Sequence, residues 1–340
     1  MPIEKPPPFS IMKKALIIRY GAYGDIIHMS HLPRLLRENG FAEVHVETNY
    51  KGYQLLCHNP FITKIEGIAP EILFKDRPQM VAKHWLVKGE GYDKVINLVN
   101  SLESGLLAME YENVYYMSSA VRRARYENIN YYDQTTFVAG FPDLAGKYHG
   151  EVFYTPREHE LVEKWMAEYA GRFSILINLS GTGPHKRFVQ AQEFAELCLS
   201  TFEDAHIITT GSPECPELDL PAARCTHIGK RKPFREALLI AKHCSAVVGC
   251  ESGLLVGAAM WKVPTVMLMT AASIESHCKY NPNDFSLQSP AACSPCHKGP
   301  YEYRGCPHRA GNPLCVYFDI NKVLNQVGAI YDQRTANASV

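Results

Sequence analysis

The chain has 340 residues, 46% of them hydrophobic, and its 35 Lys and Arg residues balance its 35 Asp and Glu residues. This length suits two domains of ordinary size, each with its own apolar core. A net charge of zero argues against a protein that grips long stretches of nucleic acid, because phosphate neutralisation needs a basic excess. The sequence contains no apolar run of about 18 residues, so no membrane span is predicted.

The first 12 residues carry three consecutive prolines and lack the apolar core of a secretion signal. We predict that residues 1–12 form a disordered leader and that the protein is cytoplasmic, either free or peripheral at the inner face of a membrane. Four of the eleven cysteines form the cluster described below, and the other seven are expected to be reduced, partly buried thiols.

Short apolar runs alternate with helical patterns in the first half of the chain. Residues 15–19 read as a buried parallel strand that ends in a glycine turn, and residues 26–36 as the helix that follows. Further strands are expected at 43–47, at 94–99 and near Val114, the last followed by loops.

The second half repeats this alternation. Strands are expected at 173–179, 206–210, 246–248 and 265–269, and helices at 158–169, 191–202, 234–243, 254–261 and 319–330. Two βαβα series predict an α/β protein made of two doubly wound, Rossmann-like domains that face a cleft. The expected parts are an N-terminal domain at 13–155, a C-terminal domain at 156–318 with a Cys-rich loop at 293–315, and a helix and tail at 319–340.

A glycine turn follows the first strand, at the sheet edge where ligands of α/β proteins bind. Gly21, Gly24 and Asp25 form it, and their backbone amides could meet an anion. The G-x-x-G spacing alone favours a simpler interpretation, a tight turn in which Asp25 caps the helix.

Residues 15–40, ALIIRYGAYGDIIHMSHLPRLLRENG, resemble the opening of glycosyltransferase family 9, the ADP-heptose:lipopolysaccharide heptosyltransferases. The matching residues are Gly24, Asp25, His28 and Pro33. Residues 92–98, YDKVINL, are similar to the family's third-strand signature, with Asn97 where the family often has Asp. The resemblance extends over roughly residues 13–327 and implies the GT-B fold, with the acceptor on the N-terminal side near Gly24 and His28.

The loop after the strand at 173–179 resembles the family's donor-phosphate loop through Gly181, Thr182, Gly183 and Lys186. Glycine amides, a hydroxyl and a lysine suit a diphosphate on chemical grounds as well. After the next strand, Glu214 or Glu217 could accept hydrogen bonds from the donor ribose. Solvated carboxylates in a surface turn are the alternative for both.

Residues 249–259 resemble the family's strand-to-helix signature, in which helix amides at Ser252 and Gly253 face the diphosphate. Two positions depart from it, because Glu251 replaces the usual Asp and Val256 the usual His. These departures support an alternative function, a non-catalytic relative that only binds nucleotide sugars.

Arg122 and Arg123 lie among tyrosines and could hold a phosphorylated or nucleic-acid acceptor. A solvated loop is the equal alternative. This cluster is the support for a further hypothesis, sugar transfer to a modified DNA base or to a protein.

Four cysteines fall close together, at Cys293, Cys296, Cys306 and Cys315. Four thiolates in one loop could close a tetrahedral zinc site, although the spacing is not that of a standard zinc ribbon. A structural role, by zinc or by packing, is favoured over catalysis.

The hypothesis that joins these observations is an inverting, metal-independent glycosyltransferase that needs no cofactor. A nucleotide-sugar donor binds the C-terminal domain, and a glycan or lipid-linked glycan acceptor enters from the N-terminal domain. Asp25 accepts the proton of the acceptor hydroxyl, while Lys186 and helix amides stabilise the leaving diphosphate. This hypothesis collapses if a structure shows Asp25 buried or turned away from the pocket that contains Lys186.

Overall fold

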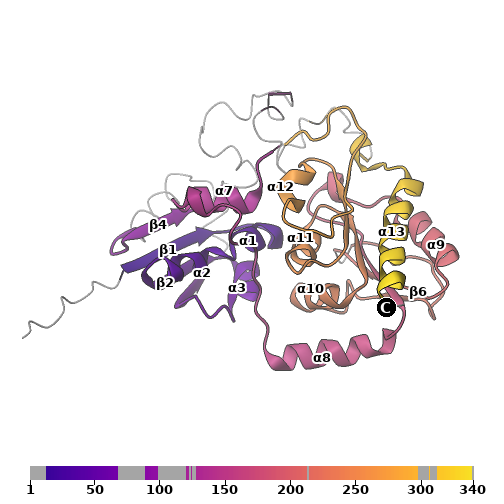
Figure 1. Cartoon of the computed structure of the whole chain (residues 1–340), viewed down its shortest axis with the longest axis horizontal. Coiled ribbons are helices and arrows are strands. Elements are labelled where there is room, and N and C mark those ends of the chain that lie inside the picture. The colour runs from indigo at the N-terminus through magenta and orange to yellow at the C-terminus, as the bar shows by residue number, and fades with distance from the viewer. Residues whose placement is uncertain are drawn as a thin grey trace, which may run out of the picture.

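The computed structural model describes residues 13–67, 89–98, 120–121, 124, 128–212, 214–297, 306 and 312–338. The predicted leader at 1–12, the strand expected near Val114, and Arg122 and Arg123 lie outside these residues. Within them the chain forms two α/β parts side by side (Figure 1). No helix of the described residues combines the length and the apolar character that a membrane crossing would need.

The N-terminal part is built on a parallel sheet with the strand order β3-β2-β1-β4. The apolar run that follows Lys14 explains why β1 is its buried central strand. The strands are β1 (Lys13–Arg19), β2 (Phe41–Thr48), β3 (Lys64–Gly67) and β4 (Lys94–Asn97). The helices are α1 (Tyr23–Met29), α2 (Leu32–Glu38), α3 (Tyr50–Leu56) and α7 (Tyr131–Val138), and η3 (Pro142–Leu144) is a 3₁₀ turn.

The single helix predicted over residues 26–36 is wrong, because the structure has two helices there. α1 ends at Met29 and α2 begins at Leu32. Pro33 is the physical reason: it has no N–H to donate to the carbonyl of Met29, and its ring would clash with that carbonyl in a continuous helix. The break places Ser30 and His31, both fully buried, between the two helices.

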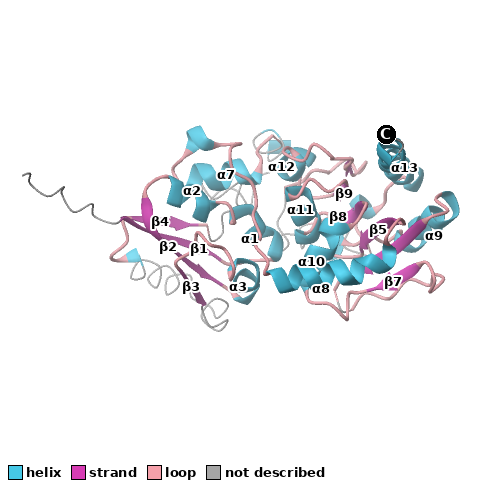
Figure 2. Cartoon of the chain, turned by 60° about the horizontal axis from the view of Figure 1, so that its bottom comes forward, coloured by secondary structure: helices cyan, strands magenta, loops and turns pink. Residues whose placement is uncertain are grey.

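The C-terminal part contains a six-stranded parallel sheet with the order β10-β9-β8-β5-β6-β7 (Figure 2). Its strands are β5 (Phe173–Asn178), β6 (Ala205–Thr210), β7 (Cys225–His227), β8 (Ala246–Cys250), β9 (Thr265–Met269) and β10 (Leu287–Gln288). Its helices are α8 (Pro156–Met166), α9 (Ala191–Thr201), α10 (Phe234–His243), α11 (Gly253–Met260), α12 (Ile274–Cys278) and α13 (Ile320–Ala338). Short 3₁₀ turns are η4 (Ala167–Tyr169), η5 (Pro184–Lys186) and η7 (Leu314–Val316).

Each sheet has a switch point, which is the place where the strand order reverses. In the N-terminal sheet β1 lies between β2 and β4, and in the C-terminal sheet β5 lies between β6 and β8. Ligands of open α/β sheets bind outside the carboxyl ends of the strands at such points. The loops that leave β1, β5 and β8 are therefore where a site is expected.

The two parts meet through α1 and α11, which lie side by side in the middle of the molecule (Figure 1). One apolar core runs through both parts and includes Ile26 and Ile27 of α1 together with Leu254 and Leu255 of α11. A second core fills the far side of the C-terminal sheet and includes Val323 and the other inward residues of α13. The continuous core fixes the loop of β1 against the loop of β8.

Candidate active site

Two glycines bring the turn after β1 into direct contact with the turn after β8. A Cβ atom on Gly253 would lie only 2.6 Å from the backbone nitrogen of Gly24. Next to this contact, the ring of Tyr23 stacks on Phe234 with centroids 3.6 Å apart and planes 3° from parallel. The first turns of α1, α10 and α11 thus converge at the domain boundary.

Asp25 lies in the first turn of α1 and is buried, with 8% of its surface exposed, and this burial counts against the sequence hypothesis for its role. Its Oδ1 forms an ion pair of 2.8 Å with Nη2 of Arg19, and its Oδ2 accepts a hydrogen bond of 2.7 Å from the amide of Ala22. Arg19 in turn donates to the carbonyl of Leu98 at the end of β4. The helix-capping interpretation of Asp25 is thus part of its geometry, and Arg19 links this cap to the residue that follows β4 at the N-terminal switch point.

Arg19 is a site residue that the sequence interpretation did not single out. It follows the apolar run of residues 15–18 at the end of β1 and is buried. A lone charge at the carboxyl end of a buried strand, directly before a glycine turn, is the sequence signal that could have identified it.

The carboxyl ends of β5 and β8 bring Lys186 and Glu251 together at the second switch point. Nζ of Lys186 lies 3.6 Å from Oε1 of Glu251, which is 2% exposed, while the lysine keeps a quarter of its side chain exposed. Oε2 of Glu251 accepts from the amides of Thr270 and Ala272. Burial would raise the pKa of Glu251, but Lys186 and neighbouring histidines outweigh it and lower that pKa.

The glycine loop between β5 and η5 folds back on Lys186. Gly181 donates its amide to the carbonyl of Lys186 at 2.6 Å, and Gly183 adopts a φ of +92°, which favours glycine. Thr182 is exposed at the tip between them. The loop therefore carries an exposed hydroxyl and a partly exposed lysine, two groups that suit a diphosphate.

Buried histidines connect the two switch points. His28 of α1 and His277 of α12 lie with their ring centroids 5.2 Å apart. Both ring nitrogens of His28 lack a hydrogen-bond partner among the described residues, and burial lowers its pKa well below the usual value. His277 keeps a small exposed edge, yet desolvation lowers its pKa to about 4, with Glu251 and Asp25 raising it and Lys186 lowering it. The charges of Asp25 and Lys186 therefore act on the same imidazole.

His277 was missed because α12 has only five residues and no helical periodicity to read. Its position depends on tertiary contacts: the side chain of Asn130, which caps α7, donates to the carbonyls of Glu275 and Ser276. Tyr280 and Lys279 contact Asp133 of α7 as well. These bonds hold α12 of the C-terminal part against α7 of the N-terminal part.

The remaining predicted donor residues are placed less centrally. Oγ of Ser252 accepts from the side-chain amide of Asn178, so it does not cap α11. Glu214 and Glu217 are both exposed in the loop after β6. Bonds from Ser212 and from the backbone lower the pKa of Glu214, so this carboxylate is ionised at neutral pH. Neither glutamate touches the Lys186 loop through a bond between described residues.

The four clustered cysteines lie behind the Lys186 site. Burial, together with the nearness of Cys296, Cys293 and Cys306, raises the pKa of Cys315 to about 12. Glu251 acts on Cys315 in the same direction. The 3₁₀ turn that holds Cys315 packs against the one that holds Lys186. The turn that holds Cys315 therefore packs directly behind the turn that holds Lys186.

Comparison with solved structures gives matches over nearly the whole chain. ADP-heptose lipopolysaccharide heptosyltransferase II of E. coli matches with a TM-score of 0.63 at 16% identity, over 95% of this chain and 99% of that one. A glycosyl transferase family 9 protein of Veillonella parvula matches with 0.64 at 12% identity, over 94% and 97%. TibC, an iron-containing dodecameric glycosyltransferase of enterotoxigenic E. coli, matches with 0.61 at 11% identity, over 95% and 77%. No protein-family model and no curated protein matches the sequence.

The chain therefore has the GT-B fold of glycosyltransferases, an α/β fold with two parallel sheets flanked by helices. The fold class predicted from the sequence is confirmed. The structures that it resembles include glycosyltransferases of family 9, which agrees with the resemblance of residues 15–40.

Proposed function

We propose that the protein is a glycosyltransferase that moves a sugar from a nucleotide-diphosphate sugar to an acceptor hydroxyl. The observation that carries this proposal is the pairing of Lys186 with Glu251 at the C-terminal switch point, next to the contact between Gly253 and Gly24. A cation near helix amides suits a diphosphate. The carboxylate of Asp25 lies in the first turn of α1, next to Gly24 in sequence, on the proposed acceptor side of the boundary.

The donor is proposed to bind the C-terminal part. Its diphosphate would take the exposed side of Lys186, the hydroxyl of Thr182 and the amides at the start of α11. Glu214 or Glu217 is proposed to accept from the ribose. Heptosyltransferase WaaC of E. coli was solved with ADP, at a TM-score of 0.52 and 12% identity, so ADP is the first nucleotide to test.

Asp25 is proposed as the general base of an inverting displacement. Its burial and its two present contacts mean that an incoming hydroxyl must share an oxygen with Arg19 or with the Ala22 amide. Each carboxylate oxygen can accept a second hydrogen bond, so the Arg19 pair orients the base without occupying it fully. The leaving diphosphate would be stabilised by Lys186 and helix amides, without a catalytic metal or other cofactor in this proposal.

The acceptor is proposed to be a glycan or a lipid-linked glycan, with Gly24 and His28 on its side of the site. Transfer at the inner face of a membrane fits the second of these acceptors. The alternative of a DNA or protein acceptor rested on Arg122 and Arg123, which lie outside the described residues, and gains no support from the structure.

The four cysteines are proposed to hold a structural metal ion. Each of the four side chains is partly buried, and the other three lie close enough to Cys315 to act on its pKa. Thiolates suit zinc and iron, and TibC is described as iron-containing. Metal analysis of purified protein, with Cys296→Ser for comparison, tests this: the variant should lose the metal and melt at a lower temperature. Equal metal content in both proteins would refute it.

The function is tested by thermal unfolding in the presence of ADP, GDP, UDP and CDP. A ligand that binds the native state alone raises the free energy of unfolding, by about 2.7 kcal/mol when its concentration is a hundred times its dissociation constant. The melting temperature rises accordingly. One nucleotide should protect the wild type and fail to protect Lys186→Ala. Equal protection of both proteins would remove Lys186 from the donor site.

A further inference from the structure

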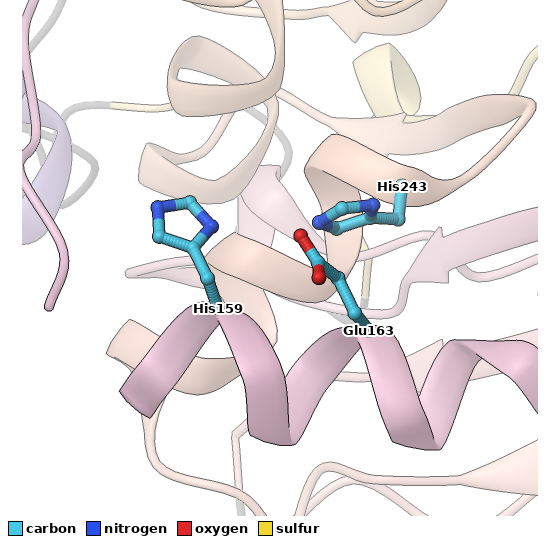
Figure 3. Close-up of side chains that lie close together, drawn as sticks. All are labelled: His159, Glu163 and His243. Atoms are coloured by element: carbon cyan, nitrogen blue, oxygen red, sulfur yellow. The ribbon is translucent and has the colours of Figure 1, made fainter. Parts of the chain in front are cut away.

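Three side chains of metal-ligand type meet where α8 packs on α10. His159 and Glu163 belong to α8, and His243 is the last residue of α10. One ring nitrogen of each histidine and one carboxylate oxygen all lie within 4.8 Å of one another. Figure 3 shows the Glu163 carboxylate directed at the His243 ring, with His159 beside it one turn earlier on α8.

Regular helices fix this arrangement. His159 and Glu163 are four residues apart, so they project from the same face of α8. The third ligand comes from a helix that packs directly on α8. The two helices are also tied at another point, where Arg235 of α10 forms an ion pair of 2.5 Å with Glu158 of α8. The three ligands therefore stand on two elements whose relative position is already set.

Other contacts leave these side chains available. Nε2 of His243 is buried and has no hydrogen-bond partner in the described part of the chain. Glu163 is exposed and forms no ion pair with the described residues. Buried polar atoms of native proteins nearly always have a partner. A bound cation would supply that partner for His243 and would bind the Glu163 carboxylate at the same time.

We propose that His159, Glu163 and His243 bind a divalent transition-metal ion of the zinc class. Two imidazoles and one carboxylate suit zinc, whereas magnesium and calcium prefer oxygen ligands alone. Three protein ligands leave a fourth position for water, and the exposure of Glu163 makes the ion exchangeable with solvent. The site is separate from the cysteine cluster and from Lys186, and it does not depend on the proposed function.

The ion would brace the segment that enters the C-terminal part. α8 begins one residue after Thr155, whose side chain and Glu158 form its capping box. α10 begins with Phe234, which stacks on Tyr23, and with Arg235, which donates to the carbonyl of Gln54 in the N-terminal part. A metal between α8 and α10 therefore stabilises the helix pair that anchors the domain boundary.

The test counts metal ions bound to the full chain. Metal-free protein is dialysed against Zn²⁺ at fixed concentration, and bound zinc is measured for the wild type, Glu163→Gln and His243→Gln. Glu160→Gln, an exposed glutamate on the same helix, is the matched control. The wild type and Glu160→Gln should bind one equivalent more than His243→Gln, and Glu163→Gln should bind that equivalent at least about tenfold more weakly.

Cobalt separates this site from the cysteines. Thiolate ligands give Co²⁺ an intense near-ultraviolet charge-transfer absorption, which imidazole and carboxylate ligands lack. The equivalent lost in His243→Gln should carry no such absorption. Because Glu163 is exposed, Glu163→Gln tests the site without disturbing the core. Equal zinc binding by the wild type and both ligand variants, or a thiolate spectrum for the lost equivalent, would overturn the proposal.

Discussion

Gly253 at the start of α11 packs against the backbone of Gly24 at the start of α1. This contact joins the turn after the first strand of one sheet to the turn after β8 of the other. Both turns hold proposed site residues, Asp25 on one side and Ser252 on the other. The separation of acceptor side and donor side therefore depends on two residues without side chains.

Replacing Gly253 with alanine should disturb this contact. Its Cβ would lie 2.6 Å from the Gly24 nitrogen and 2.9 Å from Cβ of Tyr23, so the backbone must shift. Overpacking of this kind costs about 1–3 kcal/mol. We expect a lower melting temperature and a loss of transferase activity larger than the loss of stability explains.

Gly328→Ala is the matched control for that variant, because an added Cβ at this helical position of α13 meets nothing within 4 Å. It should be neutral or slightly stabilising, since alanine is the better helix former. Equal activity of Gly253→Ala and Gly328→Ala would show that the close contact does not matter to the reaction.

The Lys186–Glu251 pair predicts that stability and donor binding respond differently when the two residues are replaced. Lys186→Ala leaves Glu251 buried without its cation and should cost about 2 kcal/mol of stability. Adding Glu251→Gln removes the buried charge, while the amide oxygen can still accept from Thr270 and Ala272. The double variant should therefore regain stability and still fail to bind the nucleoside diphosphate.

A thermodynamic cycle over these variants measures that coupling. Urea unfolding gives the free energy of unfolding of each variant, and the shift in melting temperature with ADP reports nucleotide binding. Additive stability losses in the double variant would mean that Lys186 does not compensate the charge of Glu251.

Buried His31 predicts a loss of stability in acid. Desolvation lowers its pKa from 6.5 to about 3, so the unfolded chain binds the proton and the folded chain does not. The free energy of unfolding is therefore unaffected by His31 above pH 7, falls as the pH drops below 6.5, and reaches the full loss that His31 can cause near pH 3. One such histidine accounts for about 2 kcal/mol between pH 6.5 and pH 5.

His31→Gln should flatten the profile of unfolding free energy against pH in this range, and its amide can still bond Thr136. His58→Gln controls for the removal of a histidine, since His58 lies near the surface with 44% of its side chain exposed. An unchanged slope in His31→Gln would show that His31 takes up its proton while the protein is folded.

Much of the fold could be predicted because apolar runs bounded by glycines mark buried parallel strands. The helix at 234–243 and the strand at 265–269 have the bounds that the pattern indicated. The pattern failed at Pro33. The apolar periodicity continues through this residue, although its missing N–H breaks the helix. It also missed β7, whose three residues are too few for a period to be seen.

The site could be predicted only where it lies on a strand-end loop. Gly24, Asp25, Lys186 and Glu251 follow buried strands, so their positions at sheet edges follow from the fold class. His277 lies on a five-residue helix that Asn130 of the other part holds in place. Asn130 donates to the carbonyl of Ser276, which is 146 residues away in the sequence. Tertiary contacts over such distances leave no local pattern in the sequence.

The role of Asp25 is the central claim, and Asp25→Asn tests it most directly. Asparagine keeps an oxygen that can accept from the Ala22 amide, so the cap survives while the base is lost. Donor protection in thermal unfolding and nucleoside diphosphate release with a glycan acceptor are measured on the same preparation. The account predicts unchanged protection and release slowed about 100-fold or more. Release near the wild-type rate would contradict it and leave Asp25 as a helix cap alone.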